Sequence, residues 1–80
     1  MKVYGYPAGA PLNEHGLVEL LEVSLATDAQ TLRRVASFLM RQADEMDAMG
    51  SGFGHAHAQD EDRSWPEEWP DIIVVRSVGD

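Results

Sequence analysis

The clearest pattern along the chain is a run of apolar residues with helical spacing between about residues 28 and 49. These residues recur at intervals of three and four, which places them on one side of an α-helix. They are Leu32, Val35, Ala36, Leu39, Ala43 and Met46. Phe38 and Met49 fall beside this stripe, so we expect them to flank the core and to be partly exposed. The pattern predicts a long amphipathic helix with Leu39 in the core.

Both ends of this helix carry recognisable signals. Thr27 is followed three residues later by Gln30, a capping-box pattern that satisfies two free backbone N–H groups at a helix start. Gly50 lies just beyond the apolar stripe, and glycine readily adopts the left-handed conformation that ends many helices. The signals therefore predict a helix that begins after Thr27 and ends before Gly50.

The segments on either side of the helix favour strands. Residues 17–26 alternate between two faces, although a helical spacing also fits the start of this segment. Residues 72–75 form a β-branched apolar run between Pro70 and Gly79, too short for an independent helix. Residues 2–6 predict a short edge strand that ends at Pro7.

Residues 55–60 alternate polar with small side chains, and they could form a further strand parallel to the second one, in a right-handed crossover. The expected fold is α+β. One long amphipathic helix packs on one face of a three- to four-stranded mixed sheet, in the order ββα(β)β. Residues 1–80 would form a single domain, with a flexible joint at about residues 49–54, where three of six residues are glycine.

The short length of the chain and the apolar residues on both faces of its last strand indicate that it associates with another protein chain. A chain of 80 residues buries only about 60–65% of its unfolded surface and is expected to be marginally stable. In the last strand, Ile72 and Val74 alternate with Ile73 and Val75, so both faces are apolar while one helix can cover only one. We therefore expect a homodimer.

Cysteine is absent, so the chain has no disulfides or thiolate metal sites, which favours a reducing compartment. The first twenty residues lack the charged and apolar regions of an export signal, and no apolar stretch approaches the ~18 residues of a membrane span. We expect a cytoplasmic protein that does not interact with membranes.

The net charge of −8 is concentrated in residues 44–71, where nine acids face a single basic residue, Arg63. Such a field repels a phosphate backbone, which argues against nucleic-acid binding, and it attracts a basic protein surface. The alternative is a solvated segment that only keeps the chain soluble. The acids are Asp44, Glu45, Asp47, Asp60, Glu61, Asp62, Glu67, Glu68 and Asp71.

A loop at about residues 58–70 places two tryptophans among these acids, and Pro66 and Pro70 stiffen it. One tryptophan could cover the core, and the other could anchor an interface, since tryptophan is enriched at binding hot spots. The candidate partner-binding residues are therefore drawn from the acids and from this loop. They are Asp44, Glu45, Asp47, Asp60, Glu61, Asp62, Trp65, Glu67, Glu68 and Trp69.

The sequence gives little support for catalysis, cofactor binding or metal binding by this chain. No serine lies in a nucleophile elbow and no glycine-rich loop has a phosphate-binding form, so we expect no catalytic residues, no enzymatic activity and no cofactor. In an extended segment His55 and His57 would share a face and could hold a metal with Asp60. Such pairs are more often hydrogen-bonded or exposed to solvent, so no metal site is expected.

The order of these features resembles the immunity protein 32 family of bacterial polymorphic toxin systems. It comprises a helix capped at Thr27, FGHAH at residues 53–57, the acidic tryptophan loop and PDIIVV at residues 70–75. The resemblance covers about residues 17–76. It implies a small cytoplasmic α+β protein that binds and neutralises a cognate toxin. Together with the acidic charge, it makes a basic toxin domain the expected partner. The alternatives are a structural or adaptor module and a small metal-binding protein that uses its histidines.

Overall fold

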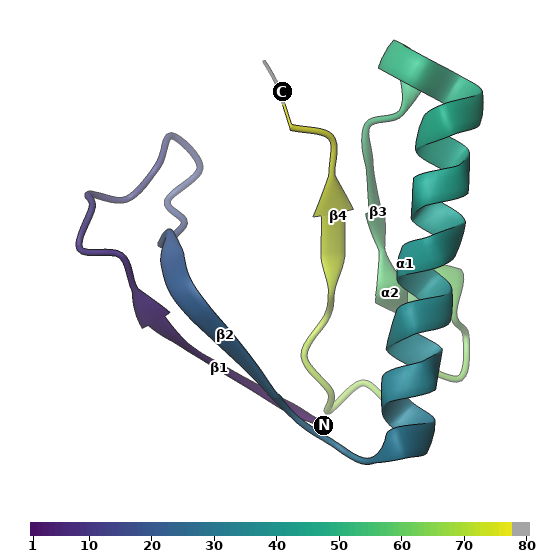
Figure 1. Cartoon of the computed structure of the whole chain (residues 1–80), viewed down its shortest axis with the longest axis horizontal. Helices are drawn as coiled ribbons and strands as arrows, with labels where there is room; N and C mark the ends of the chain where they lie inside the picture. The colour runs from purple at the N-terminus through teal and green to yellow at the C-terminus, as the bar shows by residue number, and fades with distance from the viewer. Residues whose placement is uncertain (78–80) are drawn as a thin grey trace.

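The computed structural model describes residues 1–77, and its elements follow one another in the order ββαββ (Figure 1). The α+β class and this order are confirmed. Within residues 1–77, no helix has both the length and the apolar composition needed to cross a lipid bilayer. The elements are β1 (Lys2–Pro7), β2 (Leu20–Ala26), α1 (Ala29–Met49), the 3₁₀ turn η1 (Gly50–Gly52), β3 (His55–His57), the short helix α2 (Ala58–Glu61) and β4 (Ile73–Val75).

The strands form two separate antiparallel hairpins instead of one mixed sheet. β1 pairs with β2, and β3 pairs with β4, and within residues 1–77 no ladder joins the two pairs. The predicted parallel pairing of residues 55–60 with the second strand is therefore wrong. Pairing β3 with β4 closes a shorter loop than pairing it with β2 across the whole of α1, so the entropic cost is lower.

The helix α1 has the predicted length, but its first cap is one residue later than expected. Asp28, not Thr27, is the N-cap, and its Oδ1 accepts a hydrogen bond from the N–H of Thr31 at 2.7 Å. A carboxylate also suits the positive end of the helix dipole. At the other end the prediction is confirmed, since Gly50 has a φ of +56° and its N–H donates to the carbonyl of Met46.

The core lies between α1 and the segment that follows it, and the buried side of α1 differs from the predicted stripe. Phe38 is 1% exposed, whereas Leu39 is 44% exposed. Both stripes satisfy helical spacing, and burying the large Phe38 ring against β3 and α2 selects the second one. The buried helix residues are Thr31, Val35, Phe38 and Gln42. The other core residues are Phe53, Ala56, Ala58 and Trp65, with Met46, Ile72 and Val74 packed against them.

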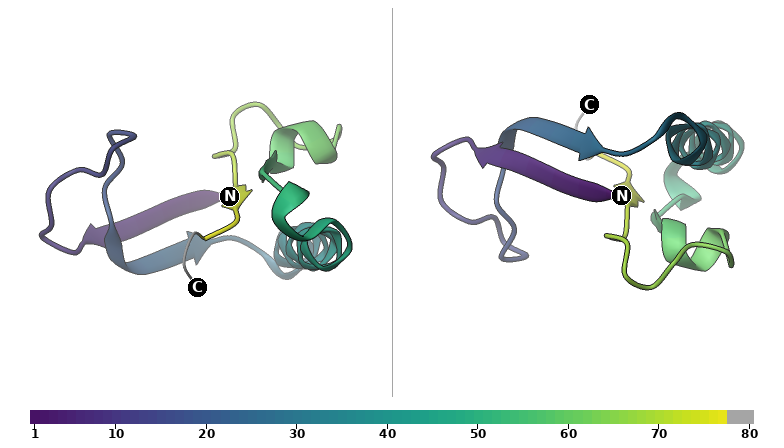
Figure 2. Two further views of the ribbon diagram at one scale, coloured as in Figure 1. Left: turned by 90° about the horizontal axis from the view of Figure 1, so that it is seen from above. Right: turned by 90° about the horizontal axis from the view of Figure 1, so that it is seen from below.

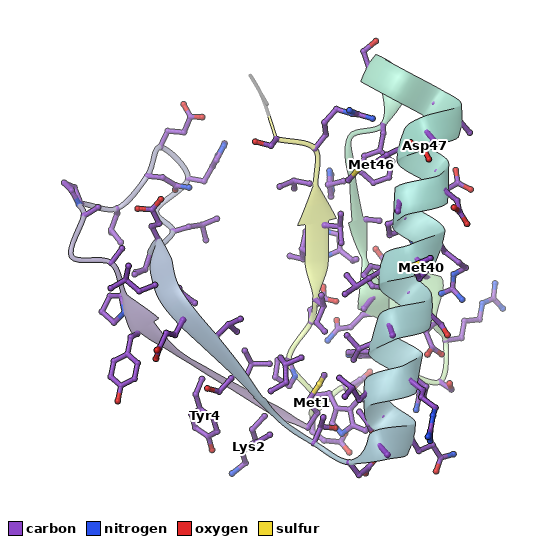
Figure 3. The ribbon with its side chains drawn as sticks, viewed as in Figure 1. Met1, Lys2, Tyr4, Met40, Met46 and Asp47 are labelled. Atoms are coloured by element: carbon purple, nitrogen blue, oxygen red, sulfur yellow. The ribbon has the colours of Figure 1, made fainter. Side chains whose placement is uncertain are left out.

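The β1–β2 hairpin stands apart from this core. All of its residues are exposed, and it is angled away from β4 and α1 (Figures 1 and 2). Met1, just before β1, packs against the core. In Figure 3, Lys2 and Tyr4 project from the side of the hairpin that faces away from β4. The predicted packing of the helix on a sheet therefore applies to the β3–β4 hairpin alone.

Candidate protein-binding site

Arg34 organises the surface where residues 58–72 lie against α1. Its Nη2 donates to Asp62 Oδ2 and to the hydroxyl of Ser64, both at 2.9 Å. Its guanidinium also stacks on the ring of Trp69, 5.2 Å from the ring centroid. One side chain of α1 thereby holds an ion pair, a hydroxyl and an aromatic ring of the following segment in place. Arg34 was not among the predicted site residues, because its partner Asp62 is 28 residues away and no local pattern joins them.

The two tryptophans have different environments. Trp65 is 6% exposed, and its Nε1 donates to the carbonyl of Pro70 at 3.1 Å. Trp69 is half-buried, and its ring meets that of Trp65 edge-on with 5.3 Å between centroids. Trp65 thus covers the core, and of the two indoles Trp69 has the larger surface to offer a partner.

Asp62 is held by internal bonds. The N–H and the hydroxyl of Ser64 donate to its Oδ1 at 3.0 and 2.6 Å, and Arg34 binds its other oxygen. Hydrogen bonds from Ser64 and then from Arg34 hold the pKa of Asp62 below its ordinary value. Its charge is therefore compensated within the chain, and Asp62 is better described as a positioning residue than as a partner contact.

The remaining acidic candidates fall into two groups. Asp44, Glu45 and Asp47 lie on the C-terminal half of α1, about 15–20 Å along the helix axis from Arg34. Figure 3 shows Asp47 near that end of the helix. The second group, with Trp69, is named the acidic loop patch. It consists of Asp60, Glu61, Glu67, Glu68 and Trp69.

The carboxylates of the acidic loop patch are exposed, and within residues 1–77 none of them forms an ion pair. A groove of about 290 Å³ on α1 adjoins Asp62 and carries the opposite charge. Its lining includes Arg33, Arg34 and Arg41. The surface around Arg34 therefore places negative and positive regions side by side.

The histidine pair has the predicted geometry. His55 and His57 share a face of β3, and their rings meet edge-on with 5.2 Å between centroids. His57 Nδ1 lies 2.7 Å from Asp71 Oδ2, and the other oxygen of Asp71 accepts the N–H of Gln59 at 3.0 Å. Within residues 1–77, no three metal-ligating side chains come together in a suitable group. The contacts of His57 link β3 to the end of the loop.

Three aspartates make the stability of the fold depend on acidity. Hydrogen bonds from Thr31 lower the pKa of Asp28, as those from Ser64 and Arg34 lower that of Asp62. At Asp71 partial burial works in the opposite direction, but the Gln59 N–H and His57 outweigh it and lower the pKa. The folded chain therefore binds fewer protons than the unfolded chain, and this stabilisation is lost as pH falls below the ordinary aspartate value of 3.8.

We expect the melting temperature to fall as the pH is lowered through 3.8. It should fall less in Asp62→Asn, which has already lost one of these carboxylates. Thermal melts followed by circular dichroism measure this difference. Glu68→Gln, which removes an exposed carboxylate, is the matched control and should keep the pH dependence of the parent. An Asp62→Asn variant with the full acid sensitivity of the parent would show that the Arg34–Asp62 pair does not contribute.

Compared with protein-family models, with curated proteins and with solved structures, the chain shows no significant match. The resemblance to immunity protein 32 therefore stays a prediction from the sequence.

Proposed function

We propose that the chain is an inhibitory binding protein of the immunity type, which engages a basic protein through the acidic loop patch. The observation that carries the proposal is that residues 58–72 form an ordered loop. Hydrogen bonds hold this loop at several points, and its acidic side chains are exposed. Arg34, Ser64 and the Trp65–Pro70 bond hold its middle, and Asp71 holds its end. A preformed loop loses little conformational entropy when it binds.

The charges of the patch favour a basic partner. Four carboxylates project from this ordered segment without an internal counter-ion among residues 1–77. In such an arrangement the rim charges accelerate encounter, and a partly buried aromatic such as Trp69 supplies short-range contact. A toxin that acts on nucleic acid has a basic substrate channel, which an acidic inhibitor can occlude.

The immunity role itself rests on the order of motifs in the sequence. An adaptor role would use the same patch with a different partner. Because an immunity gene sits beside the gene of its toxin, the purified product of the neighbouring gene is the direct probe. Stable complex formation and loss of the toxin's activity are expected, whereas binding without inhibition would favour the adaptor role.

Neutralising the acidic loop patch should slow association by about 10-fold or more at low salt and flatten its salt dependence. The test variant combines Asp60→Asn, Glu67→Gln and Glu68→Gln. The matched control combines Asp44→Asn, Glu45→Gln and Asp47→Asn, which changes the net charge equally at the far end of α1. Stopped-flow association at several salt concentrations compares them.

Trp69→Ala should instead raise the dissociation rate at little cost in association rate, because a packed aromatic acts after encounter. Its circular dichroism spectrum must match that of the parent, since Trp69 also touches Trp65. Equal slowing by the two triple variants would mean that net charge alone steers the partner. Unchanged rates in the loop variant would place the interface elsewhere.

A further inference from the structure

The chain exposes more surface than a folded monomer of its size. Its accessible area is 6265 Å², whereas a monomer of 8.8 kDa is expected to expose about 4,800 Å². Its radius of gyration is 13.8 Å, against about 12 Å for a compact chain of this length. A standard protein interface covers about 800 Å² on each partner, so the surplus is large enough for a stable dimer.

Much of this surplus is apolar and lies on one face of the β1–β2 hairpin. The register places Val3 opposite Leu25 and Gly5 opposite Val23. Beyond a register shift, Pro7 lies opposite Leu20, whose side chain lies over Gly5. The apolar hairpin face is defined as Val3, Leu20, Val23 and Leu25. These side chains are 36% to 60% exposed. The opposite face carries Lys2, Tyr4, Tyr6, Glu22 and Ser24.

Val3, Val23 and Leu25 of the apolar hairpin face form one wall of a groove of about 330 Å³. The other wall is formed by Leu39 of α1 with Pro70 and Ile72 before β4. Asp71 is the one charged residue among those that line the groove, and it is engaged by His57. No acid of the acidic loop patch lines the groove, so contact between two copies there does not bury the carboxylates of that patch.

β4 adds a free edge and further apolar side chains. Ala58 N–H donates to the carbonyl of Ile72, and Arg76 N–H donates to that of Gly54. Alternation along an antiparallel ladder then directs the backbone groups of Ile73 and Val75 away from β3, toward an edge that no strand of residues 1–77 covers. Their side chains are also more than half exposed. Exposed apolar edges of this kind pair with other chains.

We propose that the groove is the interface of a two-fold homodimer, in which the apolar hairpin face of each copy packs into the groove of the other. Each chain carries both the apolar hairpin face and the groove. The hairpin of one copy can therefore enter the groove of its partner while the partner's hairpin enters the groove of the first copy, as a closed two-fold interface requires. The interface is separate from the acidic loop patch, and each copy would keep that patch free. The splayed hairpin is then the arm that the second copy covers.

Sedimentation velocity of the full chain from low micromolar to submillimolar concentration tests the proposal. The parent should sediment as a dimer, and Val23→Lys should raise the dimer dissociation constant by about 30-fold or more, as loss of a hot-spot contact does. Ser24→Lys is the matched control: it adds the same charge at the next residue, on the opposite hairpin face, and should remain dimeric. A parent that is monomeric throughout, or two variants that behave alike, would overturn the proposal.

A second pair on the helix keeps the test decisive if a hairpin variant fails to fold. Leu39→Lys changes the groove wall, and Met40→Lys changes the next residue, which is 65% exposed and does not line the groove. Leu39→Lys should dissociate the dimer and Met40→Lys should not, with circular dichroism confirming that both remain folded. Neither pair alters the acidic loop patch, so a monomeric parent that still binds a basic partner would overturn the dimer and leave the proposed function standing.

Discussion

Replacing Phe38 by alanine is expected to lower the free energy of unfolding by about 3–5 kcal/mol, enough to unfold most of a marginally stable chain. Phe38 is the largest fully buried side chain in the described structure, and it belongs to the core cluster with Val35 and Trp65. The truncation would remove this contact area and leave a cavity between α1 and the β3–α2 segment. Urea denaturation followed by circular dichroism measures the loss.

Two neighbouring positions on α1 make the measurement specific. Leu39→Ala should cost clearly less than Phe38→Ala, because the side chain of Leu39 is 44% exposed along the groove. Met40→Ala should cost the least, since Met40 is 65% exposed. All three substitutions end in alanine on the same helix, so differences in helix propensity are small. A larger loss for Leu39→Ala than for Phe38→Ala would restore the orientation predicted from the sequence.

Replacing Trp65 by alanine is expected to have a comparable effect, about 3–5 kcal/mol. The indole closes one end of the core, and its Nε1 is bonded to the Pro70 carbonyl. Its removal would leave a large cavity and deprive Trp69 and the stacked Arg34 of their support. The loop that carries the acidic loop patch should therefore lose its order together with the core.

Equilibrium unfolding of single-tryptophan variants tests this expectation. Trp69→Ala should be destabilised less than Trp65→Ala, because Trp69 is only half-buried. Trp65→Phe should fall between the parent and Trp65→Ala, since it keeps an aromatic ring but loses the hydrogen bond to Pro70. If Trp69→Ala proved the more costly substitution, the roles assigned to the two indoles would have to be exchanged.

The stabilities of the Trp65 and Trp69 variants separate loss of loop structure from loss of a direct contact with a partner. A Trp65 variant that loses a partner would report unfolding of the loop, whereas a folded Trp69 variant with faster dissociation would report a direct contact. The same distinction separates Asp62, which is bonded to Arg34 and Ser64, from Glu67 and Glu68, which are free to meet a partner.

The sequence by itself determined the elements whose signals are local. α1 begins within two residues of the predicted cap and ends at Gly50, because apolar spacing and the glycine beyond it act within a few turns. The aliphatic run at residues 72–75 likewise contains β4, and the i, i+2 spacing placed His55 and His57 on one face. Each depends on side chains close together along the chain.

Only the tertiary structure decided which surfaces meet. Two stripes on α1 satisfy the same helical period, and packing of the Phe38 ring against β3 and α2 chose between them. The pairing of β3 with β4, the burial of Trp65 and the bond between Arg34 and Asp62 join residues that no local pattern connects. These pairings depend on how well distant side chains fill the core and on the length of the loop that each pairing closes. Both are properties of the folded chain and cannot be found in a local sequence pattern.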